Sequence, residues 1–424
     1  MIETESEEDA GQAVRHKVLE RIRHMAEHAI IRDRRFLDDE QLVKSEQLAL
    51  LDQIYAANVR DAELQELSSH FAGILRGDSP VHLAVWGKTG TGKTLTLTYF
   101  LNLLSEMAGA EGIAVRHQHL DLSTPRPCFR ALNDLACLMG ASRRYKKGIS
   151  LEELMLRIEA KLAEFRGYLI LFIDEIDNVR RDRDALLSFL VRRLPQRIPA
   201  KLVLVFVSNK LNWTDNIDPR VQSFLKLNEL IFKPYDAIDL RTILSIRVQK
   251  SLAPNAILPG AGVVERIAAL ASREHGDARR AVGLLSRSAY LAEKAGRPID
   301  EALVDQAAAE LDTDRYLSLL RSAPAQLRAA MWAVIDAVAR NRGAAASTRD
   351  AHAAYRRVCE RVGLRALTGR AFGDLVAELD MYSLVTARVQ SKGRYGRSRQ
   401  ISIDLPPDLV DRITEVLRLS FDGG

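Results

Sequence analysis

Hydrophobic and polar positions follow two different patterns along the chain. Between residues 31 and 235, continuous apolar runs at 81–86, 168–173 and 201–207 are separated by stretches with helical periodicity. Runs that are apolar at every position are typical of strands buried on both faces, and helices between such strands are typical of a parallel sheet. The pattern therefore predicts an α/β domain with a parallel sheet over residues 31–235.

Only helical periodicity continues after this region. Apolar positions recur at three- and four-residue spacing through 240–247, 264–271 and 278–291, which predicts a small helical domain over residues 236–320. The first 30 residues begin with a run of acids, followed by Val14, Val18, Ile22 and Met25 at helical spacing. We expect an arm that is partly disordered, with a helix that docks on the next domain; a separate DNA-binding arm is the alternative.

The last hundred residues predict a different kind of domain. Apolar positions from 327 to 338 lie on one helical face, and two more helices are expected from about Ser347 to Val362 and from Thr368 to Tyr382. Ser347 and Thr368 are suitable N-caps. Two short strand patterns follow, around 384–389 and 400–403. Three helices followed by a β-hairpin are the elements of a winged helix, which we expect over residues 321–424.

The charge is unevenly distributed. The 424 residues include 61 Lys and Arg against 56 Asp and Glu, a net charge of +5, and the part from Pro324 onward contains sixteen basic and eleven acidic residues. This last domain therefore carries the whole excess. Residues 388–399 contain five basic residues and no acid. Localised positive charge indicates an anionic partner.

Composition excludes several classes of protein. With 47% apolar and 28% charged residues, the chain is not wholly disordered. No apolar run reaches the roughly 20 residues of a membrane span, and the acidic N-terminus is unlike a signal peptide, so we expect a cytoplasmic protein with no membrane partner. Cys128, Cys137 and Cys359 form no C-x-x-C pair, so neither a disulfide framework nor a zinc site is expected.

A phosphate-binding motif follows the first apolar run. Residues 87–94 are G-K-T-G-T-G-K-T, which fits G-x-x-x-x-G-K-[ST] between a strand and a helix. Backbone N–H groups of such a loop bind phosphate oxygens, Lys93 would reach the β- and γ-phosphates, and the Thr94 hydroxyl would bind Mg²⁺. We therefore expect ATP or ADP with Mg²⁺ to bind at Gly87, Lys88, Thr89, Gly90, Thr91, Gly92, Lys93 and Thr94.

Polar side chains follow the other two apolar runs. Asp174 and Glu175 come directly after 168–173, where one carboxylate can hold Mg²⁺ and a second can orient and deprotonate an attacking water. We assign the metal to Asp174 and the water to Glu175; the alternative, a solvated acidic turn, is disfavoured by the phosphate motif. Asn209 follows the third run and is a candidate sensor of the γ-phosphate, with a plain strand cap as the alternative.

Two arginines, Arg279 and Arg280, lie near the start of a predicted helix. An arginine at this place can swing onto the γ-phosphate and make the angle between two domains depend on ATP. An exposed helix face is the alternative.

The order of the motifs resembles one family. The chain reads G-K-T-G-T-G-K-T, I-D-E-I-D, V-S-N, D-P-R-V-Q-S, K-P-Y-D-A and G-D-A-R-R-A, and this order resembles the origin-recognition initiators of the AAA+ ATPase class, best known from archaea. The resemblance runs from about residue 31 to 403, and residues 355–363, 367–370, 379–381 and 393–397 look like the winged helix of that family. It implies a slow, regulatory ATPase that binds duplex DNA at origin repeats to initiate DNA replication.

The resemblance also implies roles for single residues. Asp174 and Glu175 match the metal and catalytic carboxylates, and Asn209 matches the first sensor. Arg279 matches the second sensor. Tyr235 and Arg247 match a tyrosine and an arginine that contact the nucleotide in the family. Two interpretations of Arg220 stay open: an arginine finger towards a neighbouring subunit, and an arginine at the start of a helix.

DNA contacts are expected mainly in the last domain. The helix that starts at Thr368 would lie in the major groove, and the basic hairpin would straddle the DNA backbone. The alternative is that the basic residues only keep the hairpin soluble. The expected contacts are Thr368, Arg370, Arg388, Lys392, Arg394, Tyr395, Arg397 and Arg399. Arg126 and Arg130 lie where the family carries a helical insertion that faces DNA.

Other partners and rival functions remain open. The family implies recruitment or loading of the replicative helicase, further copies of the protein on DNA, and a nucleoid-associated location. A nucleotide-switched DNA-binding regulator with little hydrolysis and a mobile-element ATPase that delivers DNA targets are alternatives. Lys210 stands where the family more often has an acid, and residues 212–216 depart from the pattern of the family before Asp218.

The basic hairpin makes a prediction about salt. Five phosphate contacts would give a slope of about −4.5 in a plot of log affinity against log salt concentration, at about 0.9 per contact. Replacing Arg394, Arg397 and Arg399 together with Ala removes three of these contacts and is expected to flatten the slope to about −1.8. Fluorescence anisotropy with duplex DNA at several salt concentrations measures it, and an unchanged slope would reject the hairpin as the contact.

Overall fold

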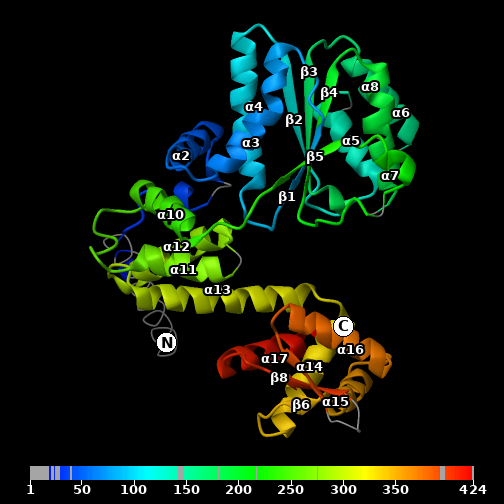
Figure 1. The fold of residues 1–424 in the computed structure, drawn as a ribbon. Helices are drawn as coiled ribbons and strands as arrows, with labels where there is room; N and C mark the ends of the chain where they lie inside the picture. Colours follow the sequence, from blue (N-terminus) through cyan, green and yellow to red (C-terminus); the bar gives the residue numbers. More distant parts are fainter. Residues whose placement is uncertain are drawn as a thin grey trace, which may run out of the picture. The chain divides into compact units, whose positions relative to one another are not determined.

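The chain folds into two compact units, Met1–Val304 and Asp305–Gly424. The computed structural model (Figure 1) describes residues 19–20, 23, 29–38, 41–141, 148–179, 181–215, 217–274, 276–391 and 397–422. The division falls inside one helix, α13 (Glu301–Ser322), and the predicted boundary between residues 320 and 321 lies later in this helix. Val14, Val18, Ile22 and Met25, which predict an N-terminal helix, lie outside the described residues.

A parallel five-stranded sheet forms the centre of the first unit, with strand order β2-β3-β4-β1-β5. Its strands are β1 (His82–Trp86), β2 (Val115–Asp121), β3 (Tyr168–Asp174), β4 (Lys201–Ser208) and β5 (Leu227–Ile231). The three predicted apolar runs are β1, β3 and β4, which confirms the α/β prediction. Both edge strands were missed because exposed polar residues, as in Arg116 and Glu229, interrupt their apolar pattern.

Helices cover both faces of the sheet (Figure 1). On one face, α3 and α4 pack against alternate strand residues that include Leu83 and Val85. On the other face, α5, α6, α7 and the turns after it pack against residues that include Ala84 and Trp86, because successive strand side chains point to opposite faces. The helical segments are α2 (Lys44–Ala56), α3 (Asp61–Phe71), η3 (Ala72–Arg76), α4 (Lys93–Ala110), α5 (Cys128–Leu138), α6 (Leu151–Leu162), η4 (Ile176–Asn178), α7 (Arg183–Ser188), η5 (Phe189–Arg193), α8 (Leu194–Arg197) and α9 (Pro219–Gln222).

A helical lid follows the sheet, as the sequence pattern predicts. It consists of α10 (Ala237–Ser251), α11 (Val263–Arg273), α12 (Ala278–Ala295) and the start of α13. The short N-terminal turn η1 (Arg34–Leu37) packs on α10 and α12, and Ile31 forms a β-bridge with Leu252. Residues 30–37 therefore belong with the lid, although the sequence pattern grouped residues from 31 onward with the sheet.

The second unit has the predicted winged-helix elements. Its segments are α14 (Ala325–Arg340), β6 (Ala346–Ser347), α15 (Thr348–Arg361), α16 (Gly369–Met381), β7 (Thr386–Ser391), β8 (Arg397–Ser402) and α17 (Pro407–Asp422). The side chains of Ser347 and Thr368 accept hydrogen bonds from N–H groups in the first turns of α15 and α16, which confirms both N-caps. Tyr355 and Phe372 are fully buried in its core. Among the described helices, none has both the length and the apolar character to cross a membrane.

One buried carboxylate fastens the N-terminal segment to the lid. Glu293 on α12 is 5% exposed, and its Oε1 accepts hydrogen bonds from the N–H groups of Ile30 at 3.1 Å and Ile31 at 3.0 Å. Arg34 Nη2 lies 3.3 Å from the other carboxylate oxygen.

Replacing Glu293 with Ala is expected to lower the free energy of unfolding by about 1–3 kcal/mol, because it leaves these donors without an acceptor. Urea denaturation of the whole chain measures the change. The matched control is Glu265→Ala on the exposed side of α11, which should change stability by no more than about 0.5 kcal/mol. Equal effects of the two substitutions would contradict the fastening role.

Candidate nucleotide site and DNA-binding surface

The phosphate loop connects β1 to α4 and is packed closely by the lid. Gly90 and Gly92 have φ angles of 75° and 80°, in the left-handed region that favours glycine. A Cβ on Gly90 would lie 1.8 Å from Asp277 Oδ1, and one on Gly92 would lie 2.2 Å from the Tyr235 hydroxyl oxygen. Both positions require glycine, and both bring the loop into direct contact with residues at the lid.

Lys93 begins α4 and lies at the centre of the loop. Its Nζ donates hydrogen bonds to the carbonyl oxygens of Gly87 and Lys88, each at 2.8 Å, and to Asn209 Oδ1 at 2.9 Å. Burial lowers the pKa of Lys93 to about 8, partly opposed by the negative charge of Asp174. The ammonium group is thus poorly solvated. The negative charge of an arriving phosphate would compensate for its positive charge.

Thr94 and Asp174 place two oxygen groups beside the loop. The Thr94 hydroxyl donates a hydrogen bond of 2.6 Å to Asp174 Oδ2. Burial alone would raise the pKa of Asp174, but hydrogen bonding and the charges of His119 and Lys93 hold it below its usual value. His119 Nε2 is 3.7 Å from Asp174 Oδ2, which is too long for a good hydrogen bond and makes an ion pair only when the imidazole is protonated.

This pair of oxygen groups fits Mg²⁺. Magnesium in nucleotide sites takes one or two protein oxygens and completes its shell with phosphate and water. The described residues contain no group of three or more His, Cys, Asp or Glu that could hold a metal ion without such ligands. Thr94 and Asp174 are therefore suited to a metal that arrives with the nucleotide.

Glu175 is held in a strained and polar position at the carboxyl end of β3. Its φ of 54° is unusual for a residue other than glycine. Asn178 Nδ2 donates a hydrogen bond of 2.7 Å to Glu175 Oε2. Burial, together with the charges of Asp174, Asp177 and Asp121, raises the pKa of Glu175. A carboxylate with a raised pKa is better suited to accept a proton from water.

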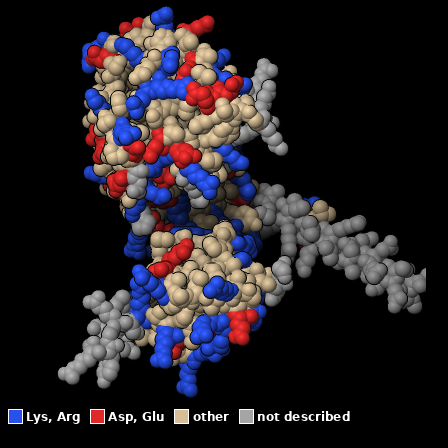
Figure 2. Space-filling view, turned by 90° about the vertical axis from the view of Figure 1, so that its right-hand side faces the viewer, with Lys and Arg blue, Asp and Glu red and all other residues tan. Residues whose placement is uncertain are grey.

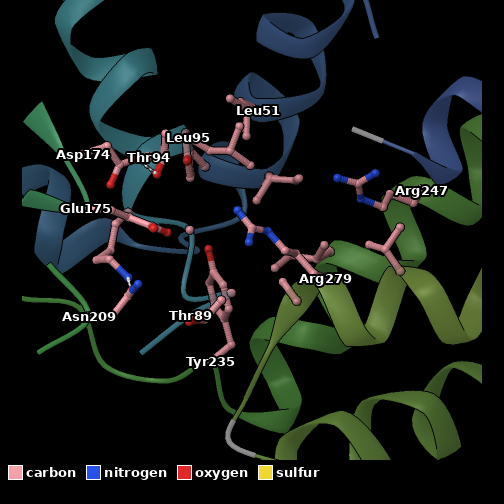
Figure 3. Close-up of a pocket in the computed structure, with 18 residues that line it drawn as sticks. Leu51, Thr89, Thr94, Leu95, Asp174, Glu175, Asn209, Tyr235, Arg247 and Arg279 are labelled. Carbon is pink, nitrogen blue, oxygen red and sulfur yellow. Dashed lines mark hydrogen bonds between the residues drawn. The ribbon is translucent and has the colours of Figure 1, made fainter. Parts of the chain in front are cut away.

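The opposite wall of the pocket is apolar and comes from α2 and the lid. Leu51, Ile54 and Ile243 line it, beside Arg247 and Arg279 (Figure 3). Arg247 is 4% exposed and donates a hydrogen bond of 2.8 Å to the carbonyl oxygen of Phe36. Figure 3 shows Arg279 extending from α12 into the pocket, and its charge is close enough to contribute to the lowered pKa of Lys93.

Most of the predicted nucleotide residues meet in this one pocket. Its lining includes Thr89, Gly90, Gly92, Lys93, Thr94, Asp174, Glu175, Asn209, Tyr235, Arg247 and Arg279. Arg280 instead forms an ion pair with Glu274 at 3.1 Å. Arg220 is exposed at the start of α9 and does not line the pocket. The backbone N–H of Arg220 donates a hydrogen bond of 2.7 Å to Asp218 Oδ1, the N-cap of this short helix.

The sequence did not predict three residues that contact the phosphate loop or the two carboxylates beside it. Asn178 binds Glu175, His119 lies beside Asp174, and Arg60 bonds the carbonyl oxygen of Thr91 in the phosphate loop. Asn178 follows Glu175 by three residues, and its amide could have been noticed. His119 and Arg60 come from β2 and the start of α3, and no local motif marks either of them.

The predicted DNA contacts are only partly within the described residues. Thr368 caps α16, Arg370 is exposed in its first turn, and Arg388 is exposed on β7. Arg399 Nη1 lies 3.4 Å from the Gly373 carbonyl oxygen of α16. Lys392, Arg394 and Tyr395 lie outside the described residues, as does the side chain of Arg397. On the face visible in Figure 2, the winged-helix unit shows more Lys and Arg than Asp and Glu.

The two arginines expected to face DNA from the first unit differ. Arg126 is partly buried and forms an ion pair with Asp134, and its Nε donates to the Thr124 carbonyl oxygen at 2.9 Å. Arg130 is exposed on α5. The opposite side of α5, including Leu132 and Leu135, is buried in the core beside the sheet.

The fold and the pocket together define an AAA+ ATPase with a helical lid, followed by a winged helix. Models of an AAA ATPase domain, a Cdc6 AAA+ ATPase-type lid domain and a CDC6 C-terminal winged helix domain match residues 59–205, 241–309 and 318–413. The chain is 31% identical to an ORC1-type DNA replication protein of Pyrococcus furiosus over 85% of this chain and 86% of that protein. It belongs to the family of ORC1-type DNA replication proteins.

Two further similarities agree with this assignment. ORC1-type DNA replication protein 1 of Aeropyrum pernix is 33% identical, over 86% of this chain and 90% of that protein. The solved structure of the Aeropyrum pernix ORC1 protein in complex with DNA has a TM-score of 0.73 and 31% identity, over 93% of this chain and 98% of that one. The resemblance noted from the sequence motifs is confirmed.

The position of Glu175 predicts a separation of binding from turnover. Glu175→Gln keeps the size of the side chain but removes the proton acceptor, so kcat for ATP hydrolysis is expected to fall by about 10²–10⁴-fold. The Kd for ATP, measured by isothermal titration calorimetry, should change little. Glu111→Gln at the exposed end of α4 is the matched control and should leave kcat unchanged. Normal turnover in Glu175→Gln would remove Glu175 from the catalytic role.

Proposed function

We propose that this protein initiates DNA replication by binding origin duplex DNA in a manner that depends on ATP, with slow hydrolysis that resets it. The observation that carries the proposal is the shared pocket, in which Lys93 and Thr94 of the sheet domain face Arg279 of the lid, in a chain that ends in a winged helix. Membership of the ORC1-type family and similarity to an ORC1 structure solved with DNA support it.

Within this proposal, the pocket residues divide the work on ATP. The loop from Gly87 to Thr94 binds the phosphates. Thr94 and Asp174 would hold Mg²⁺, which would neutralise negative charge on the phosphates. Glu175 accepts the proton of the attacking water. Asn209 and Arg279 contact the γ-phosphate, so loss of this phosphate would loosen the lid from the sheet domain.

DNA binding is assigned to the winged helix. Arg370 in the first turn of α16 would enter the major groove, and Arg388 and Arg399 on the hairpin strands would contact phosphates. The same assignment covers Lys392, Arg394, Tyr395 and Arg397. Arg126 is the weakest of the proposed contacts, because its charge is already paired with Asp134.

Partners beyond DNA belong to the same proposal. Recruitment of the replicative helicase and binding of further copies on DNA rest on family membership alone. Arg220 is exposed, and a neighbouring copy could therefore meet it as an arginine finger.

The proposal predicts where the protein binds in the cell. Genome-wide mapping of bound sites, compared with the positions where replication begins, is expected to show a small number of bound sites that coincide with replication starts. Glu175→Gln, which should retain ATP, is expected to keep the same sites. Binding only at ordinary promoters would contradict replication initiation, and random coating of the genome would favour target delivery.

A further inference from the structure

A buried arginine outside all of the sequence motifs lies under the phosphate loop. Arg60 is the N-cap of α3, and it has a left-handed backbone conformation with φ of 63°. Its side chain is only 4% exposed and forms an ion pair with Glu63 at 2.6 Å. A buried charge and an unusual backbone conformation both cost free energy, so the surrounding contacts must hold Arg60 firmly in place.

One nitrogen of Arg60 joins two distant segments of the chain. Nη2 donates a hydrogen bond of 2.8 Å to the carbonyl oxygen of Thr91 and one of 2.7 Å to the carbonyl oxygen of Lys233. Thr91 is in the phosphate loop. Lys233 is in the segment that leads from β5, which ends at Ile231, to the first lid helix.

The guanidinium group also packs on two aromatic residues of this connecting segment. The Arg60 guanidinium carbon is 3.9 Å from the centre of the Tyr235 ring and 5.3 Å from that of Phe232. The Tyr235 hydroxyl lies directly against Gly92. Arg60 therefore contacts the connecting segment through both a carbonyl group and a ring, and the ring in turn contacts the loop.

The bond to Thr91 has a consequence for phosphate binding. In a planar trans peptide the C=O and the following N–H point in opposite directions. Because Arg60 holds the Thr91 carbonyl group on one side of the loop, the N–H of Gly92 points to the other side. Inward-pointing N–H groups are what a phosphate loop uses to bind phosphate oxygens.

The same segment is in contact with the start of the lid helix that carries Arg279. The Tyr235 N–H donates to the Gly276 carbonyl oxygen at 3.3 Å, and the Ala278 N–H donates to the Gly90 carbonyl oxygen at 3.1 Å. Loop, connecting segment and the first turn of α12 are thus joined in a closed ring of contacts that passes through Arg60.

We propose that Arg60 is a positioning residue that sets the Gly92 N–H for phosphate binding and couples the phosphate loop to the segment on which the lid moves. It contacts no nucleotide itself and acts through Thr91, Lys233 and Tyr235. The proposal rests on the proposed function in one respect, namely that ATP binds in this pocket.

Two variants test this role. Arg60→Lys keeps the positive charge but cannot make both carbonyl bonds in the planar geometry of a guanidinium group, and Arg60→Met also removes the charge. The matched control is Arg76→Lys. The Arg76 side chain is 69% exposed and forms an ion pair with Asp78. Thermal unfolding of each variant reports whether it folds, and Arg60→Lys is the variant used if Arg60→Met does not.

The first measurement compares ligands with and without phosphates. The Kd values of ATP, ADP and adenosine are measured by competition with a fluorescent ATP analogue. In Arg60→Lys, the affinity for ATP and ADP is expected to fall about 10- to 100-fold, which is the effect of losing one hydrogen bond to a charged group. The affinity for adenosine is expected to stay within about twofold of the wild-type value. Equal losses for all three ligands would show a merely structural role and overturn the proposal, as would unchanged ATP affinity.

The second measurement follows the coupling. In the wild type, ATP is expected to slow hydrogen exchange in a peptide covering residues 233–240, and in Arg60→Lys at saturating ATP this slowing should be lost. Slowing equal to that of the wild type would overturn the coupling. If the wild type itself binds no ATP, the proposed function fails; if it binds ATP and the Arg60 variants match it, only the role of Arg60 fails.

Discussion

The close contact between the phosphate loop and the lid is the constraint on which the nucleotide site depends. Gly90 and Gly92 have no side chains, so Asp277 and the Tyr235 hydroxyl can lie against the loop backbone. The Ala278 N–H bonds directly to the Gly90 carbonyl oxygen. A shift of the loop around a phosphate must therefore be accommodated by the residues that begin α12, because there is no intervening side chain or space to absorb it.

The incompletely compensated charges in the pocket favour a polyanion that brings its own cation. Burial lowers the pKa of Lys93, while burial and neighbouring carboxylates raise the pKa of Glu175. Both shifts show groups that lack compensating charge or solvation. A triphosphate would compensate Lys93 and Arg279, and its metal would compensate Asp174. A bound nucleotide would replace polar contacts within the pocket, such as that of Lys93 with Asn209, by contacts to its phosphates.

The winged-helix unit differs from the first unit in how its charges are distributed. Its interior is an ordinary apolar core, centred on Tyr355 and Phe372, and its excess of basic residues lies in sequence around the hairpin from 388 to 399. The first unit, by contrast, pairs much of its charge internally, as Arg193 does with Glu152 and Glu159. The small net charge of the whole chain is therefore the sum of a neutral part before Pro324 and a basic part after it, so the distribution of charge along the sequence is more informative than its sum.

The sequence alone determined those features whose cause is local. The buried strands β1, β3 and β4 are apolar at nearly every position, and the phosphate motif, Asp174, Glu175 and Asn209 occupy the ends of those strands, where a parallel sheet brings them together. Only the tertiary structure decided the rest. The edge strands, the attachment of residues 30–37 to the lid and the positions of Arg60 and His119 depend on contacts between segments far apart in the chain, and such contacts leave no periodic or motif pattern at either partner.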